Sequence, residues 1–256
     1  MQCYKKLCWK ATIAAALVLA MSTQAQVVSY NFDNNGTVGG DGAGSGPVAS
    51  ATAGVVAAGY WYNDWPSYLT TDLTDSAGNP TTMDIGWANN SGTWAIQFSH
   101  PGQDGNGSWN KEMVNGYING LGSAGAAVTL SEIPFLEYDV YVYLTSDDAT
   151  RIGTVTDGAT TYSFGVLDNM ITGADALLVQ TTDTGLSHPE ANYALFSGLS
   201  GTSQTFSTWY RLGDDTDDSY GGISGIQIVA VPEPSTMALG AMGLLLIGAS
   251  RRLRRS

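Results

Sequence analysis

The sequence predicts an all-β domain, a two-sheet β-sandwich of jelly-roll-like form, between an N-terminal signal peptide and a C-terminal transmembrane helix. Gly, Ser, Thr, Asn and Asp recur every several residues along the central part of the chain, as in proteins with many turns. Several short segments alternate polar and nonpolar residues, and none shows a sustained helical period. About ten short strands in about 200 residues favour two packed sheets.

The alternation is clearest in residues 93–99 and 138–145. It directs six side chains inward: Trp94, Ile96, Phe98, Val140, Val142 and Leu144. In the second segment, Asp139, Tyr141 and Tyr143 are expected to point outward. Further strands are expected at residues 27–32, 55–62, 126–130, 152–156, 160–166, 192–196, 204–212 and 223–231. A short helix is expected at residues 112–118, although Gly116 favours a loop there.

The first 25 residues have the three parts of a secretory signal peptide. Lys5, Lys6 and Lys10 precede an uncharged run over residues 11–21, and small residues then lead to a cleavage site after Ala25. The run is too short to span a bilayer, which takes about 20 residues. We therefore expect signal peptidase to remove residues 1–25.

Residues 26–230 are expected to form one exported domain, which is strongly acidic. Between Gln26 and Val231 there are three basic residues against 22 acidic ones, a net charge of −19. Such a domain repels phosphate backbones, so we expect no nucleic-acid partner. The acidity serves solubility or binds cations such as Ca²⁺, and solubility needs no special geometry. Both cysteines precede the predicted cleavage site, so the exported domain has no thiol.

Residues 231–256 form a tail with three successive parts. Pro232, Glu233 and Pro234 interrupt regular structure and leave an accessible segment. A nonpolar stretch, predicted as a transmembrane helix over residues 235–250, follows them. A basic end over residues 251–256 then holds the terminus on the cytoplasmic side. Its four arginines are Arg251, Arg252, Arg254 and Arg255.

These three parts, in this order at the end of the chain, resemble the PEP-CTERM sorting signal. The tail is also known as an ice-binding-protein C-terminal domain, a name that implies nothing about ice here. The resemblance implies that a membrane protease-transpeptidase, exosortase, recognises Pro232, Glu233 and Pro234. It further implies a Gram-negative-type bacterium in which such proteins are linked to exopolysaccharide or the extracellular matrix.

The exported domain itself resembles galactose-binding-like jelly rolls of exported bacterial proteins. The resemblance lies in the order of segments, chiefly residues 133–144, then Ser146 and Asp147, and later residues 222–228. It implies a sandwich and does not imply a sugar ligand.

Catalytic patterns are sparse in the exported domain. Its two histidines, His100 and His188, each precede a proline in a turn-like setting, and there is no Gly-x-Ser-x-Gly motif with a partner histidine. A glycosidase needs two carboxylates across a cleft, and among 22 acids some pair is always available. For Glu112, Glu132 and Glu137 we expect solvated side chains.

A calcium site is one interpretation of the densest acidic cluster, which consists of Asp214, Asp215, Asp217 and Asp218. Clustered carboxylates suit a structural Ca²⁺, although the spacing differs from that of an EF-hand. The alternative is a solvated loop before the last strand. Asp147 and Asp148 form a weaker candidate.

Aromatic residues give a hint of carbohydrate binding. The candidate residues are Trp61, Tyr62, Asn63, Asp64, Trp65 and Trp109. Flat rings beside amide and carboxylate groups suit sugars. The alternative is core packing, since strand alternation buries Trp61 or its neighbours in any case.

Together these features predict a non-enzymatic protein delivered to the cell envelope, cell surface or extracellular matrix, with carbohydrate binding as the leading activity. A structural matrix protein without a discrete ligand and a polysaccharide-active hydrolase or lyase are the alternatives. The expected partners are signal peptidase and exosortase during processing, the membrane through the tail, and a polysaccharide. The one candidate cofactor is a structural calcium.

Overall fold

The computed structural model describes residues 25–32, 47–48, 52–63, 68–89, 91–96, 101, 103–122, 125–167, 176–213 and 217–232. Contacts divide the chain into two units, one of residues 1–25 with 232–256 and one of residues 26–231. Only the second lies largely within the described residues. Among these residues, no helix is long and apolar enough to cross a membrane. The predicted transmembrane helix at residues 235–250 lies outside them.

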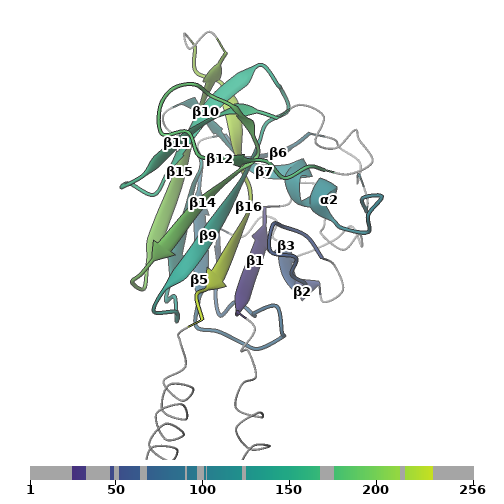
Figure 1. Ribbon diagram of the computed structural model, residues 1–256, viewed down its shortest axis with the longest axis vertical. Coiled ribbons are helices and arrows are strands. Elements are labelled where there is room, and N and C mark those ends of the chain that lie inside the picture. The colour runs from purple at the N-terminus through teal and green to yellow at the C-terminus, as the bar shows by residue number, and fades with distance from the viewer. Residues whose placement is uncertain are drawn as a thin grey trace, which may run out of the picture. The chain divides into compact units, whose positions relative to one another are not determined.

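Two mixed β-sheets face each other across a core, which confirms the predicted β-sandwich (Figure 1). The described residues of the first sheet form nine strands: β1 (Val27–Asn31), β2 (Pro47–Val48), β3 (Trp61–Asn63), β6 (Thr93–Ala95), β7 (Gly116–Leu121), β9 (Tyr138–Thr145), β12 (Gln180–Thr181), β14 (Tyr193–Leu199) and β16 (Tyr220–Ala230). Those of the second form seven: β4 (Leu69–Thr70), β5 (Asp84–Ala88), β8 (Ala127–Ser131), β10 (Arg151–Thr156), β11 (Thr161–Val166), β13 (Glu190–Ala191) and β15 (Gln204–Leu212).

The strand order explains which segments meet. The first sheet runs β12-β14-β9-β16-β1-β3-β2, with β7 pairing the start of β16 and β6 pairing β7. The second runs β13-β11-β10-β15-β8-β5-β4. Most neighbours are antiparallel, whereas β1 with β3, β11 with β13 and β12 with β14 are parallel. The first and last long strands of the domain, β1 and β16, therefore lie side by side.

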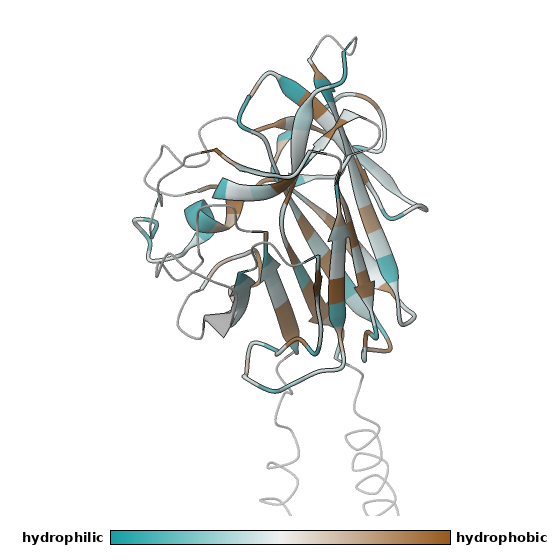
Figure 2. Cartoon of the chain, turned by 180° about the vertical axis from the view of Figure 1, so that it is seen from behind, coloured by the Kyte–Doolittle hydropathy of each residue, from teal (hydrophilic) through white to brown (hydrophobic). Residues whose placement is uncertain are grey.

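The main core lies between the sheets. Nonpolar and polar residues alternate along the strands, which Figure 2 shows as alternating brown and pale residues, so each strand turns its nonpolar side chains toward this core. Val140 and Val142 of β9 face Val155, Phe164 and Phe206 of the second sheet across this core. Each of these side chains is fully buried. Burial of such side chains provides the main driving force for folding, at about 1.5–3 kcal/mol for each.

A second, smaller core covers the other face of the nine-stranded sheet. The short helix α2 (Asn110–Asn115) contributes Met113 and Val114, which pack with Trp61, Tyr143 and Tyr193. Tyr143 lies on the face away from the main core, as predicted, but it does not reach solvent. Its side chain is fully buried because α2 and its neighbouring loops cover this face.

Several sequence-based expectations need correction. The strand predicted at 93–99 ends at Ala95. Ala95 is buried and Trp94 is 40% exposed, which is opposite to the expected direction. Of the strand predicted at 55–62, only the last two residues are in a strand, because residues 54–57 form a turn. That turn needs Gly54, whose φ is +90° and whose absent Cβ would lie 2.1 Å from Oε1 of Gln227.

The predicted helix at 112–118 is also displaced. Helix α2 ends at Asn115, and Gly116 is the first residue of β7. The prediction that Glu112 is solvated is wrong, because its side chain is fully buried on α2, whereas Glu132 and Glu137 are exposed. Strands β5 and β7 have no counterpart among the sequence-based expectations.

Replacing Phe206 by alanine is expected to lower the free energy of unfolding by about 3–5 kcal/mol, as for other buried phenylalanines. Its ring is fully buried and its centroid lies 5.0 Å from that of Phe196 on the opposite sheet. Denaturant titration measures the change. Leu136→Ala, at a side chain that is 76% exposed, is the control and should change stability by at most about 0.5 kcal/mol. Equal effects of the two substitutions would contradict the assigned core.

Candidate functional site

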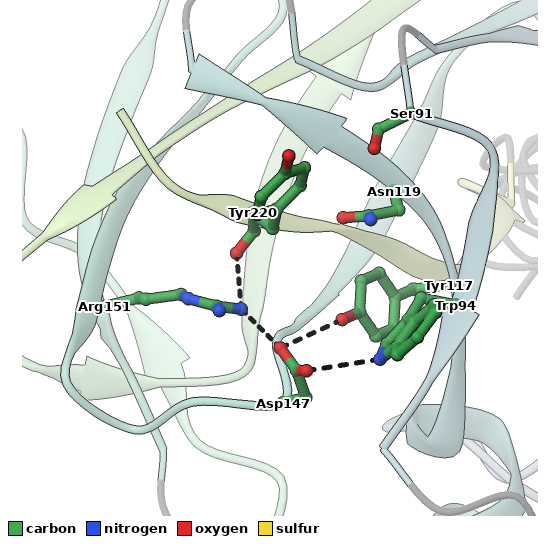
Figure 3. Close-up of a pocket in the computed structure, with 7 residues that line it drawn as sticks. All are labelled: Ser91, Trp94, Tyr117, Asn119, Asp147, Arg151 and Tyr220. Carbon is green, nitrogen blue, oxygen red and sulfur yellow. Dashed lines mark hydrogen bonds and ion pairs between the residues drawn. The ribbon is translucent and has the colours of Figure 1, made fainter. Parts of the chain in front are cut away.

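A cavity of about 290 Å³ opens beside the start of β16, next to the β6–β7 pair and the β9–β10 connection. Among the described residues, seven line it: Ser91, Trp94, Tyr117, Asn119, Asp147, Arg151 and Tyr220 (Figure 3). Two of its aromatic rings reach the surface, since Trp94 is 40% exposed and Tyr220 is 42% exposed. We call this cavity the Trp94 pocket.

Local pairing brings these residues together. Trp94 of β6 lies opposite Tyr117 of β7, and Tyr220 of β16 lies opposite Leu121 of β7. Strand β16 approaches β7 so closely that a Cβ on Gly222 would lie 1.6 Å from the carbonyl oxygen of Ile118. Glycine is therefore required where the two strands form this side of the pocket.

Asp147 is the centre of the polar network in the Trp94 pocket. Its Oδ2 accepts a hydrogen bond from Nε1 of Trp94 at 3.2 Å, and its Oδ1 accepts one from the hydroxyl of Tyr117 at 3.4 Å. Nη1 of Arg151 forms an ion pair and a hydrogen bond with the same Oδ1. The carboxylate thus fixes one exposed ring, one buried ring and one cation together (Figure 3).

Arg151 connects the network to the backbone. Its Nη1 also donates to Oγ of Ser146 at 2.6 Å and to the carbonyl oxygen of Tyr220 at 3.0 Å. The Arg151 side chain is 13% exposed and that of Asp147 is 34% exposed. A pair shielded to this degree is screened less by salt than a fully exposed one.

Burial and, second, the charge of Asp147 raise the pKa of Tyr117 well above its ordinary value. Tyr117 is fully buried and keeps its proton throughout the physiological pH range. Its hydroxyl therefore acts as a hydrogen-bond donor toward Asp147, and it is poorly suited to accept a proton from a ligand.

Two of the described residues that line the Trp94 pocket have a buried polar atom without a partner among the described residues. Oδ1 of Asn119 and Nε of Arg151 are buried and make no hydrogen bond to any residue that the structure describes. Asn119 is 7% exposed and lines the cavity. A buried polar atom without a partner costs about 1–3 kcal/mol. A ligand or a bound water that supplied a donor to Asn119 would recover that cost.

The candidate carbohydrate residues of the sequence analysis lie elsewhere. Trp61 and Asn63 are interior residues, with Nε1 of Trp61 donating to the carbonyl oxygen of Ala58 at 2.9 Å. They offer no surface to a ligand, which corrects the expectation for these two. Tyr62 is half-buried and its hydroxyl donates to Thr74, while Trp109 is half-buried against the second core. Asp64 and Trp65 lie outside the described residues.

Of the candidate calcium ligands, Asp217 and Asp218 are exposed, and Asp214 and Asp215 lie outside the described residues. Oδ1 of Asp218 accepts a hydrogen bond from Nε1 of Trp209 at 3.2 Å. Within the described part of the chain, no three His, Cys, Asp or Glu side chains converge as a metal site would require.

In the sorting tail, Pro232 is exposed and is the last described residue. Glu233, Pro234 and the arginines Arg251, Arg252, Arg254 and Arg255 lie outside the described residues, and so does His100.

Sequence reasoning missed most of the Trp94 pocket. Asp147 appeared as a weak calcium candidate and within the jelly-roll resemblance, and Trp94 was expected to face the core. Asp147 and Arg151 are four residues apart, and Arg151 is one of three basic residues between Gln26 and Val231. A rare cation close to a carboxylate is the signal that could have pointed to this pocket.

Replacing Arg151 by methionine is expected to lower the free energy of unfolding by about 1.5–3 kcal/mol, because hydrogen bonds to charged groups are worth that much and three acceptors lose their donor. Denaturant titration measures the loss. Lys111→Met removes the same charge from a half-buried residue outside the pocket and is the matched control. A loss as large in the control would show that net charge, and not the network, determines the effect.

Comparison with known protein families matches the end of the chain. The family model of the PEP-CTERM protein-sorting motif matches residues 230–255. No curated protein matches the chain. The predicted sorting tail is thereby confirmed, and it indicates export, association with the cell envelope and processing by exosortase. The chain is an exported protein that carries a PEP-CTERM sorting signal.

Proposed function

We propose that the exported domain is a non-enzymatic carbohydrate-binding module of the cell envelope, and that it binds a polysaccharide in the Trp94 pocket. The supporting observation is the combination of an exposed ring, Trp94, with a buried acceptor without a partner, Oδ1 of Asn119, in one cavity. Sugars present apolar faces that lie on aromatic rings and hydroxyl groups that donate hydrogen bonds. The cavity matches both features.

The pocket is organised before any ligand arrives. Asp147 holds the Trp94 ring through Nε1, and Arg151 holds Asp147. A ring that is already fixed loses little conformational entropy on binding, which favours affinity. The second exposed ring, Tyr220, supplies another apolar surface at the same opening.

A binding role is better supported than hydrolysis. Glycosidases use two carboxyl groups, about 5–10 Å apart, on opposite sides of the scissile bond. Among the described residues that line the Trp94 pocket, Asp147 is the one carboxylate, and it is engaged by Arg151, Trp94 and Tyr117. Such an arrangement can hold a ligand, but its described lining residues include no second carboxyl group that could protonate a leaving oxygen.

A glycan array probed with the full chain, purified in detergent, tests this proposal. We expect retention on at least one saccharide and a loss of about tenfold in affinity for Trp94→Ala, equivalent to about 1.4 kcal/mol. The matched control is Tyr68→Ala, at an aromatic side chain that is 65% exposed and lies beside β4 of the other sheet. It should retain wild-type affinity.

Three results would contradict the proposal. The first is the absence of retention on every saccharide, and the second is equal retention by the Trp94→Ala and wild-type proteins. The third is release of reducing ends from a retained saccharide, which would identify an enzyme.

A further inference from the structure

The ion pair in the Trp94 pocket presents its negative partner to the cavity. The side chain of Asp147 is more exposed than that of Arg151. Besides Asp147, Nη1 of Arg151 already has two acceptors, the hydroxyl of Ser146 and a backbone carbonyl oxygen. A ligand that enters from solvent therefore meets more of the carboxylate than of the guanidinium (Figure 3).

The Asp147 carboxylate can accept a further donor. An ionised carboxylate has about four acceptor sites, two on each oxygen. Oδ1 accepts hydrogen bonds from Tyr117 and Arg151, whereas Oδ2 accepts one from Nε1 of Trp94. Among the described residues no other side chain donates to it, so one site on Oδ2 is open to a donor from a ligand.

The connection between β9 and β10 adds a second negative charge beside the pocket. The carboxylate of Asp148 accepts hydrogen bonds from the backbone N–H and the hydroxyl of Thr150, at 2.9 and 2.7 Å. These hydrogen bonds lower the pKa of Asp148, so the carboxylate is ionised at neutral pH. Residues 147–151 thus carry two carboxylates against the one guanidinium of Arg151, a net charge of −1.

The rest of the described lining also suits a ligand that is rich in donors. Asn119, on β7, is more than nine-tenths buried and lines the cavity, and its Oδ1 has no partner among the described residues. The rings of Trp94 and Tyr220 are exposed at the opening. The face of an aromatic ring attracts a cation as well as an apolar surface.

On the basis of the proposed function, we infer that the saccharide bound in the Trp94 pocket contains a hexosamine with a free amino group. Its ammonium group has three N–H donors and no acceptor. The ammonium pairs with the open site of Asp147, and a hydroxyl group of the same sugar donates to Oδ1 of Asn119. The net charge of −19 between Gln26 and Val231 adds a general attraction for such a ligand.

The test uses the full chain in detergent and a β-1,4-linked glucosamine trimer. The matched neutral ligand is the glucose trimer of the same linkage, in which a hydroxyl group replaces each ammonium. Calorimetry is carried out at about pH 5.5, where carboxylates are ionised and amino groups protonated. The Kd of the glucosamine trimer should be about tenfold lower, because a hydrogen bond between charged groups is stronger than one from a hydroxyl.

Two charge variants separate the local effect from attraction to the whole domain. Asp148→Asn should raise the Kd of the glucosamine trimer about threefold, because a unit charge several ångströms away contributes modestly in water. The substituted amide keeps an oxygen acceptor for Thr150. Glu137→Gln, at an exposed residue before β9, changes the net charge equally and should leave the Kd unchanged. The eight residues of β9 separate the two positions by about 26 Å, well beyond the screening length of about 8 Å.

A further pair of variants locates the binding. Trp94→Ala should raise the Kd of the glucosamine trimer about tenfold, as expected for a ring in contact with the sugar, and Tyr68→Ala should leave it unchanged. Both side chains are partly exposed aromatic rings, so the comparison controls for the general effect of truncating a surface ring.

Equal Kd values for the two trimers, failure to bind the glucosamine trimer, or no greater loss for Asp148→Asn than for Glu137→Gln would overturn the inference. The glycan array decides the proposed function separately. Retention of a neutral saccharide that depends on Trp94, together with equal Kd values for the two trimers, would overturn this inference alone. The absence of retention on every saccharide would overturn both.

Discussion

The structure depends above all on the pairing of β16 with three other strands. It pairs with β9 from Gly222 to Ala230, with β1 in its second half and with β7 in its first half. Ile226 and Ile228 point into the main core. On the opposite face, Nε2 of Gln227 donates to Oγ of Ser29 at 3.1 Å and to the carbonyl oxygen of Val56 at 2.9 Å. Both cores and the Trp94 pocket are therefore built around one strand.

The sandwich and most of its long strands could be predicted from the sequence. A strand with one buried face alternates nonpolar and polar residues with a period of two, and this pattern is visible in the sequence. Residues 138–145 and 204–212 were predicted with the bounds that the structure has. Strand β7 was missed because glycine and asparagine occupy half of its positions, and its neighbour β16, not its own propensity, holds it extended. Trp94 was misassigned because alternation says which residues share a face but not which face is covered.

The candidate sites were harder to predict, for a related reason. Trp61 and Asn63 looked like a sugar-binding surface, but a second core covers the sheet face that they would need. That cover comes from α2, which is six residues long and has no strong helical period. The Trp94 pocket combines residues from strands far apart in the chain, so only the register between strands brings them together. What the sequence does show is the rarity of cations, and Arg151 lines this pocket.

The place of β16 in the chain also affects when the domain can fold. Val28 of β1, near the start of the exported domain, pairs with Ile228, near its end. A chain that emerges on the far side of a membrane from its N-terminus cannot complete this sheet until residue 230 has crossed. The residue that completes the fold is also the first residue of the matched sorting motif. Strand β16 thus becomes available to β1, β7 and β9 only when the start of the sorting motif also emerges, so the nine-stranded sheet stays incomplete until then.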